Sequence, residues 1–516
     1  MLAKIFSGAT VGLEARIVEV EVDIPDEGLP SFTIVGLPDK AVEESKERVR
    51  SAIKNSGADF PMSRITVNLA PADLPKAGPA YDLPIALGVL IAGQQINPSL
   101  QDAMFFGELS LDGSLRHTNG ILPMAYLAKS KSYKRIFVPK VNSAEASVVA
   151  GIQVFPIESL LEMVRFLSGT IKIHPAQEID IQSLLKASEA EFDFSEIIGQ
   201  EHVKRAMQVA AAGGHNIHLK GTPGSGKTMI ARALPGILPT LTPNEALEVT
   251  KIYSITGNLS QDQSLVFTRP FRSPHHTTSR IGLIGGGSNP TPGEVSLAHR
   301  GVLFLDEFPE FPRSVLESLR QPMEDGAVTI SRAKGTVSYP AKFLLVSASN
   351  PCPCGYHGDP KGRCKCMPGT IARYQKRVSG PILDRIDIHV NVPAVDPAKL
   401  LGIVKNAKTS KEIQEEVQKA RKLQNIRFKD RDRSVGRVGI VSNGEMGTKD
   451  VRTFCPLTVD SQTVLRSAVS TLNLSARSYF KVIKVARTIA DLEGAKDITT
   501  NHLAESLQYR PQENEL

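Results

Sequence analysis

The stretch from Gly221 to Thr228 constrains the fold of this 516-residue chain more than any other part of it. It follows a short run that contains apolar residues and precedes a helix-forming segment at 229–234. Glycines let backbone N–H groups turn inward toward phosphate oxygens, and the start of the next helix adds its own free N–H groups. In such a loop Lys227 reaches the β- and γ-phosphates and the Thr228 hydroxyl binds Mg²⁺. The sequence therefore predicts an ATP–Mg²⁺ site made of Gly221, Thr222, Pro223, Gly224, Ser225, Gly226, Lys227 and Thr228.

Two further apolar runs end in polar residues suited to the same chemistry. The run 301–305 leads into Asp306 and Glu307, and the run 343–349 ends at Asn350. Each run is typical of a buried strand that delivers a polar side chain at its carboxyl end. Asp306 is expected to hold Mg²⁺, directly or through water, Glu307 to polarise the attacking water, and Asn350 to orient that water. These motifs predict an α/β protein whose ATPase core contains a parallel sheet.

Length and composition limit the class of protein further. A chain of 516 residues is too long for one hydrophobic core, and 41% hydrophobic with 22% charged residues is typical of a soluble globular protein. No apolar run of 18 residues and no secretory signal is found, so we expect a cytoplasmic protein without a membrane partner. The net charge of +7 permits a polyanionic partner without requiring one.

Changes in periodicity and composition divide the chain into four parts. Residues 1–168 alternate strands and helices in mixed order, and alternating apolar and charged residues predict one strand over 11–22. Residues 169–193 resemble an acidic linker. Residues 194–393 hold the ATPase motifs, and 394–516 contain charged helices that predict a helical lid. Basic residues gather within 419–437, where a solvated helix face explains most of them and nucleic-acid contact is the alternative.

Four of the five cysteines lie close together in a Gly- and Pro-containing segment at 352–366. Two Cys-x-Cys pairs supply the four thiolates that a closed structural Zn²⁺ site requires. Free thiols in a reducing compartment are the alternative. The cysteines of this element are Cys352, Cys354, Cys364 and Cys366.

Three other segments are predicted to form a hairpin or loops. Residues 327–332 and 336–339 read as two strands of a hairpin with Lys334 in its turn, where a plain solvated lysine is the simplest interpretation. The Gly- and Pro-rich segment 284–293 predicts an exposed, mobile loop. His275 and His276 are neighbours whose side chains we expect to point apart, which favours a structural or nucleotide-proximal loop over a shared metal.

The N-terminal part resembles the proteolytic domain of Lon, which has the ribosomal-protein-S5 domain-2-like fold. The resemblance rests on the segments 75–84 and 107–113. At the positions where Lon proteases carry a nucleophilic serine and a lysine, this chain has Ala80 and, near the second position, Leu122. A Ser–Lys dyad needs a hydroxyl and an amine that takes its proton. The resemblance therefore implies a domain without peptidase activity that serves binding or assembly.

Nearly the whole chain resembles the ComM/YifB family of magnesium-chelatase-like AAA+ ATPases. The resemblance rests on strings such as PFRSPHH at 270–276, NPCPCGY at 350–356 and SGPILDRIDIHV at 379–390. It implies that Arg385 is an arginine finger acting on a neighbouring subunit and that Arg477 is the sensor-2 arginine of the lid.

The same resemblance implies what the protein does. Family members are hexameric motors that drive branch migration when incoming DNA recombines during natural transformation. It implies a homo-hexamer that binds single-stranded and branched duplex DNA, with recombination proteins as further partners. The 284–293 loop and the 327–339 hairpin would face the central channel, where Lys334 would contact DNA. A magnesium chelatase motor subunit and an ATP-dependent Lon-like protease are the alternatives.

Overall fold

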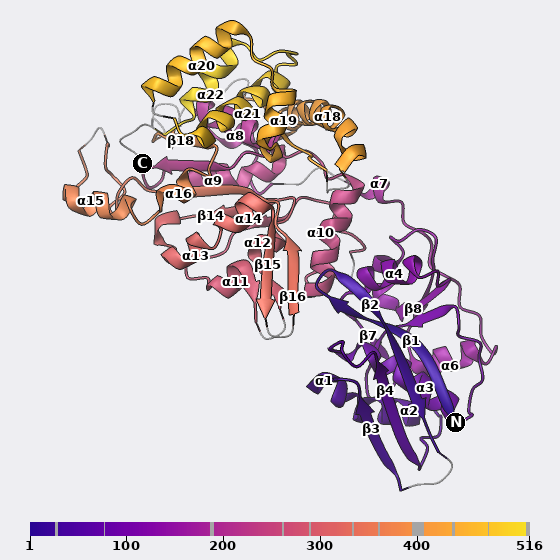
Figure 1. Cartoon of the computed structure of the whole chain (residues 1–516). Coiled ribbons are helices and arrows are strands. Elements are labelled where there is room, and N and C mark those ends of the chain that lie inside the picture. Colours follow the sequence, from indigo (N-terminus) through magenta and orange to yellow (C-terminus); the bar gives the residue numbers. More distant parts are fainter. Residues whose placement is uncertain are drawn as a thin grey trace. The chain divides into compact units, whose positions relative to one another are not determined.

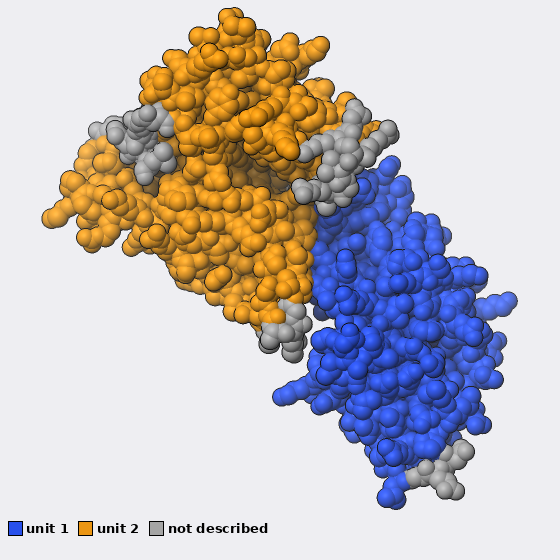
Figure 2. All heavy atoms as spheres, in the orientation of Figure 1, with its two compact units in different colours: residues 1–184, 243–267 blue, residues 185–242, 268–516 orange. Residues whose placement is uncertain are grey.

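The structure is a computed structural model of the whole chain, and the chain divides into two compact units (Figures 1 and 2). The first unit comprises residues 1–184 and 243–267, and the second comprises residues 185–242 and 268–516. The structure describes residues 1–25, 29–76, 78–185, 190–260, 263–287, 290–332, 335–359, 362–394, 407–435, 439–472 and 474–511.

The first unit contains a four-stranded sheet in the order β1-β2-β4-β3. Strands β1, β2 and β4 pair antiparallel, whereas β3 runs parallel to β4. Alternation of apolar and charged residues predicted one strand over 11–22, but a turn at Gly12, with φ +63°, separates β1 from β2. The apolar helix α3 packs on β1 and β2. The bounds are β1 Leu2–Val11, β2 Glu14–Asp23, β3 Ser31–Val35, β4 Arg64–Ala70 and α3 Asp82–Ala92.

A second sheet in this unit has three parallel strands, β5 (Ala103–Phe105), β8 (Arg135–Pro139) and β9 (Gln153–Ile157). One phenylalanine from each strand forms a stack across it, with ring centroids 4.8 and 5.0 Å apart. The stacking aromatic rings are Phe105, Phe137 and Phe155. The Ala80 and Leu122 side chains, at the positions of the Lon serine and lysine, are both buried apolar groups.

Helix α10 (Pro243–Thr256) belongs to the first unit although the chain on both sides of 243–267 belongs to the second. It contacts α4 (Ile121–Ser130): the Gly120 N–H donates to the Ser254 carbonyl at 3.0 Å. The Lys251 ammonium lies 4.3 Å from the centroid of the Tyr126 ring. Residues 243–267 lie within the predicted range 194–393 of the ATPase core, because no local pattern signals which unit a helix packs in.

The second unit is built on a parallel sheet of five strands in the order β11-β14-β17-β10-β18. Buried aliphatic side chains of β10, β17 and β18 share one core with helix α8 (Glu201–Gly213). The strands are β10 Ile217–Gly221, β11 Phe271–Arg272, β14 Val302–Leu305, β17 Leu344–Ser349 and β18 Ile388–Val392. The predicted α/β class with a parallel sheet is confirmed.

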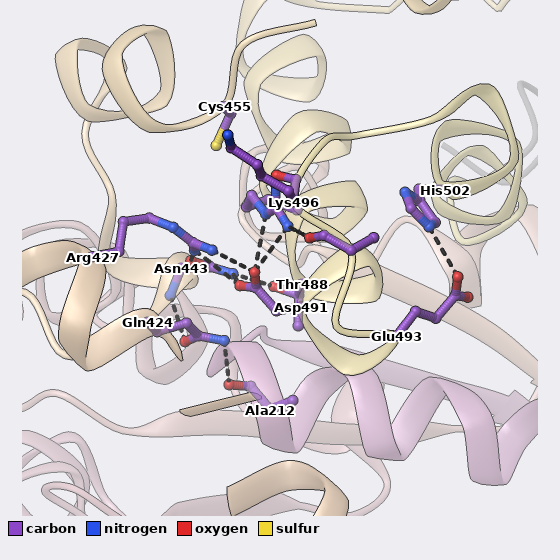
Figure 3. A network of polar contacts seen from close by, with 12 residues as sticks. Ala212, Gln424, Arg427, Asn443, Cys455, Thr488, Asp491, Glu493, Lys496 and His502 are labelled. Atoms are coloured by element: carbon purple, nitrogen blue, oxygen red, sulfur yellow. Dashed lines mark hydrogen bonds and ion pairs between the residues drawn. The ribbon is translucent and has the colours of Figure 1, made fainter. Parts of the chain in front are cut away.

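The C-terminal helices join helix α8 through a polar network, shown in Figure 3. The Asp491 carboxylate accepts from the Arg427 guanidinium at 2.9 Å and from the Asn443 amide at 2.8 Å. The Gln424 amide donates to the Ala212 carbonyl in α8 at 3.1 Å. The helices are α18 Ser410–Val435, α19 Thr448–Phe454, α20 Val459–Thr471, α21 Ala476–Leu492 and α22 Thr500–Gln508.

The two predicted surface loops differ in outcome. The hairpin forms from β15 (Ala327–Arg332) and β16 (Gly335–Pro340), and Lys334 lies outside the described residues. The prediction of an exposed loop over 284–293 is wrong in part. Within it, β12 (Gly285–Gly286) pairs with β13 (Thr291–Pro292), and Gly286 is buried. Among the residues that the structure describes, no helix has the length and apolar character needed to cross a lipid bilayer.

Candidate active site

The P-loop, residues Gly221 to Thr228, connects β10 to α9 (Lys227–Ala233). Gly224 and Gly226 have φ of +73° and +87°, and a Cβ added to either would meet no atom within 4 Å. The buried hydroxyls of Thr222 and Ser225 have no hydrogen-bond partner within the described chain. Open space above left-handed glycines, together with spare polar atoms, fits the phosphates of ATP.

Lys227 joins the P-loop to the neighbouring strand of the sheet. Its ammonium donates to the carbonyls of Gly221 and Thr222 at 2.8 and 2.9 Å, and to the Asn350 side chain at 3.2 Å. Burial lowers the pKa of Lys227, and Asp306 opposes that effect. Asn350 follows β17, which pairs with β10, so the carboxyl ends of the two strands bring the predicted phosphate-binding and water-orienting groups together.

The two residues predicted to bind Mg²⁺ are in direct contact. The Thr228 hydroxyl donates to Asp306 Oδ2 at 2.8 Å. Asp306 follows β14, and its other oxygen accepts from the Glu307 N–H at 2.9 Å. Carboxylate and hydroxyl oxygens are ligands suited to Mg²⁺, so this pair fits the ion.

Glu307 lies beside a histidine that sequence reasoning did not connect with it. Its backbone has a left-handed φ of +50°, and its Oε2 is 3.3 Å from Nδ1 of His276. The rings of His275 and His276 have centroids 4.1 Å apart, so the expectation that they point apart is wrong. Within the described chain they belong to no cluster of three or more metal-ligand residues, and His276 contacts the predicted catalytic glutamate.

The two predicted arginines, Arg385 and Arg477, meet at Glu324 and not at the P-loop. Arg385 donates to Oε1 of Glu324 at 2.6 Å, and Arg477 donates to the same oxygen. Arg385 follows α16 (Gly380–Leu383), Arg477 lies in the first turn of α21, and Glu324 lies in α14 (Arg320–Asp325). Within the described residues, neither arginine bonds to the P-loop or to the Asp306–Glu307 pair.

The four clustered cysteines come together as the sequence predicts. Their sulfur atoms all lie within 4.8 Å of one another, with Cys352 buried and the other three partly buried. The His357 N–H donates to the Cys352 sulfur at 3.3 Å. The backbone N–H of Tyr356, with Cys352, lowers the pKa of the Cys354 thiol to about 6, which favours its thiolate. The Cys366 N–H acts to lower the pKa of Cys364, but desolvation and the other thiols outweigh it and raise that pKa to about 11, so the metal assignment rests on the geometry of the four sulfurs. This donor set fits one tetrahedral Zn²⁺.

A polar cavity of about 220 Å³ adjoins Asn350 on one face of the parallel sheet. His218 lines it, and its two ring nitrogens lie 2.9 and 3.0 Å from the hydroxyls of Ser347 and Ser349. Burial lowers the pKa of His218 to about 4, so this imidazole is neutral at physiological pH. Strands of a parallel sheet are usually apolar on both faces. The polar face formed by His218, Ser347 and Ser349 was therefore not predicted from the sequence.

The fold and site together define a P-loop ATPase of the AAA+ type. Strand β10 of the five-stranded parallel sheet leads into the P-loop. Next to it β17 ends at Asn350, and beyond β17 the strand β14 ends at Asp306 and Glu307, so all three residues follow the carboxyl ends of the strands. Three family models match the chain: "Magnesium chelatase, subunit ChlI" over 193–400, "Subunit ChlI of Mg-chelatase" over 18–142, and "Magnesium chelatase, subunit ChlI C-terminal" over 407–510.

Similar proteins extend over the whole chain. The Competence protein ComM of Haemophilus influenzae is 43% identical, covering 99% of this chain and 97% of that protein. The uncharacterized protein YifB of Escherichia coli is 41% identical over the same shares. The magnesium-chelatase 38 kDa subunit of Rhodobacter capsulatus is 28% identical over 31% of this chain and 50% of its own length.

This chain belongs to the ComM/YifB family of magnesium-chelatase-like AAA+ ATPases. The family is one of ATPases, which use ATP with Mg²⁺.

Proposed function

We propose that this chain is an ATP-driven DNA motor that moves branched DNA as a homo-hexamer. In this proposal it acts in the cytoplasm, during recombination of incoming DNA in natural transformation, with recombination proteins as further partners. The observation that carries the proposal is similarity along 99% of the chain to a protein named for competence. Similarity to the magnesium chelatase subunit covers 31% of the chain.

The chemistry of the motor follows from the site. Lys227 holds the β- and γ-phosphates, while Thr228 and Asp306 hold Mg²⁺, which neutralises phosphate charge when bound. Glu307 polarises the attacking water and Asn350 orients it. Glu307 reaches that water by turning away from His276, because its carboxylate faces the imidazole at 3.3 Å.

Assembly into a ring gives Arg385 and Arg477 a nucleotide to act on. Both bind Glu324 and neither contacts the P-loop of its own chain within the described residues. In the proposed ring they contact the phosphates bound by the next subunit, so hydrolysis depends on the subunit interface. An arginine finger supplied by a neighbour is established chemistry for NTPases.

Zinc is proposed as the ion of the four-cysteine element, in which Cys352, Cys354, Cys364 and Cys366 are the ligands. Four sulfurs within 4.8 Å of one another support this assignment. A closed four-thiolate site is structural, so the ion stabilises the segment without taking part in hydrolysis.

DNA contact is proposed for the 327–339 hairpin and the 284–293 segment. Lys334 is the residue that we assign to the phosphate backbone, because in the sequence it stands between the paired strands β15 and β16. The first unit serves binding or assembly, since Ala80 and Leu122 offer neither a nucleophile nor a base.

The magnesium chelatase reading is the second candidate, because the matching family models carry that name. One experiment separates the candidates: ATPase turnover measured alone, with branched DNA, with a porphyrin and Mg²⁺, and with an unfolded protein. The DNA-motor proposal predicts that branched DNA stimulates ATPase turnover, whereas the porphyrin and the unfolded protein do not. Stimulation by the porphyrin, or degradation of the protein substrate, would overturn it.

A further inference from the structure

The loop that carries the four cysteines touches the P-loop. Gly355, between the two cysteine pairs, has a left-handed φ of +84°. A Cβ added there would lie 2.4 Å from Cγ and 2.5 Å from Cδ of Pro223. Carbon atoms at van der Waals contact are about 3.5–4.0 Å apart, so only glycine allows this approach. The two loops therefore meet backbone against ring, with no flexible side chain between them.

The cysteine loop, residues 351–366, is held close to the P-loop at its base. It begins directly after Asn350, whose side chain accepts from Lys227. The Gln375 amide donates to the Pro351 carbonyl at 3.2 Å, and the Gly355 N–H donates to the Cys352 carbonyl at 2.9 Å. Asn350 and Gly355 thus contact the P-loop on either side of the buried Cys352.

The interior of the cysteine loop depends on its sulfur atoms. Cys352, Cys354 and Cys364 lie with sulfurs 3.3 to 3.8 Å apart. Thiols are weak hydrogen-bond donors, so these contacts alone hold the loop poorly, whereas four bonds to one ion would fix it. Outside the sulfur cluster, Arg363 supports the loop by pairing with Asp359 at 2.7 Å.

We propose that Gly355 and the cysteine loop are positioning elements of the ATPase. The cysteine loop packs against Pro223 through Gly355. The P-loop backbone thereby keeps the curved conformation in which its N–H groups point toward the phosphates. Metal in the cysteine site then sets the affinity for ATP without touching it. This inference rests on the P-loop being the nucleotide site and on the proposed metal.

A matched pair of glycine variants tests the contact. Gly358 is in the same loop with φ +79°, and a Cβ there would meet nothing within 4 Å. Gly355→Ala and Gly358→Ala therefore carry the same backbone cost, and only the first pushes on Pro223. We expect Gly355→Ala to weaken binding of a fluorescent ATP analogue about tenfold, because a methyl group forced into filled space displaces Pro223 and the P-loop with it. Gly358→Ala should bind within about twofold of the wild type.

A second variant and a metal titration complete the test. Pro223→Ala in the Gly355→Ala background removes the ring atoms in the way and should recover part of the affinity. Chelation of the wild-type protein should weaken binding of the analogue, and Zn²⁺ should restore it. Melting temperature and zinc content are measured on every sample, so unfolding is recognised.

The outcomes separate this inference from the proposed function. A folded, metal-loaded Gly355→Ala variant with wild-type affinity would overturn the contact argument. If that variant does not fold, the chelation arm decides, and unchanged affinity after metal removal would overturn the inference. A folded wild-type protein that binds no ATP analogue would instead refute the nucleotide site itself.

Discussion

Arg385 and Arg477 share a single carboxylate oxygen, Oε1 of Glu324. Burial alone would raise the pKa of Glu324, but the two guanidinium groups outweigh it and hold the pKa below its usual value. The carboxylate is therefore ionised at neutral pH and fixes two arginines that are far apart in the sequence. Their common anchor means that the residues proposed as the arginine finger and the sensor arginine are positioned together.

Glu324→Gln should lower the turnover of the assembled protein about ten- to a hundredfold, because misplacing a catalytic group costs rates of that order. ATP affinity should stay unchanged, since the P-loop is untouched. Glu317→Gln is the control: Glu317 ends the helix before α14 and pairs with Arg313 of its own helix and with Arg320 of α14. Such partly exposed pairs contribute little. Equal turnover in both variants would show that Glu324 has no positioning role.

Arg385→Ala should bind ATP and hydrolyse it about 10³–10⁵-fold more slowly, as expected for loss of an arginine finger. Mixing this variant with Lys227→Ala subunits should recover part of the activity, because each supplies what the other lacks. ATPase rates are measured across mixing ratios, with mixed assemblies verified by mass. Verified mixed rings without recovery would indicate that Arg385 acts within its own chain.

Zinc should copurify with the untagged protein at about one equivalent per chain, as one four-thiolate site implies. Elemental analysis measures it, with a Cys354→Ser, Cys364→Ser double variant as the control expected to lose the metal. Cys455→Ser should keep it, because Cys455 lies in a separate buried cluster among the C-terminal helices. Metal-free protein from a chelator-free, reducing purification would leave only the free-thiol alternative.

Lys334→Ala should weaken DNA binding regardless of sequence and flatten its salt dependence. Each phosphate neutralised on duplex DNA contributes a slope of about 0.9 to log affinity against log salt. Basal ATPase should persist, since Lys334 handles no nucleotide phosphate. Lys449→Ala, on an exposed position of α19, is the matched charge control. Wild-type binding and salt slope in Lys334→Ala would make this lysine a plain solvated turn residue.

Strands, helices and loops with a signature in their own residues could be predicted from the sequence. The apolar strands β14 and β17, the P-loop and the helices of the C-terminal part lie where the sequence indicates, because buried parallel strands and amphipathic helices have local signatures. The turn at Gly12 was missed because alternation continues through the residues around it. The four cysteines were placed correctly because their spacing limits where the thiols lie.

Pairings between distant residues could not be predicted in this way. The contact of His276 with Glu307 and the shared anchor at Glu324 join segments with no common pattern. The packing of α10 in the first unit depends on surfaces formed only after folding. The approach of Gly355 to Pro223 depends on two loop conformations that the sequence leaves open.

The proposed motor couples ATP hydrolysis to the movement of DNA. The most direct measurement follows a synthetic four-armed DNA junction incubated with the full chain, ATP and Mg²⁺. We expect the wild-type protein to convert the junction into two duplexes, whereas Glu307→Gln binds ATP and the junction but leaves it intact. An ATP-hydrolysing wild-type protein that neither binds nor converts the junction would refute the DNA-motor proposal and favour a chelatase-type motor.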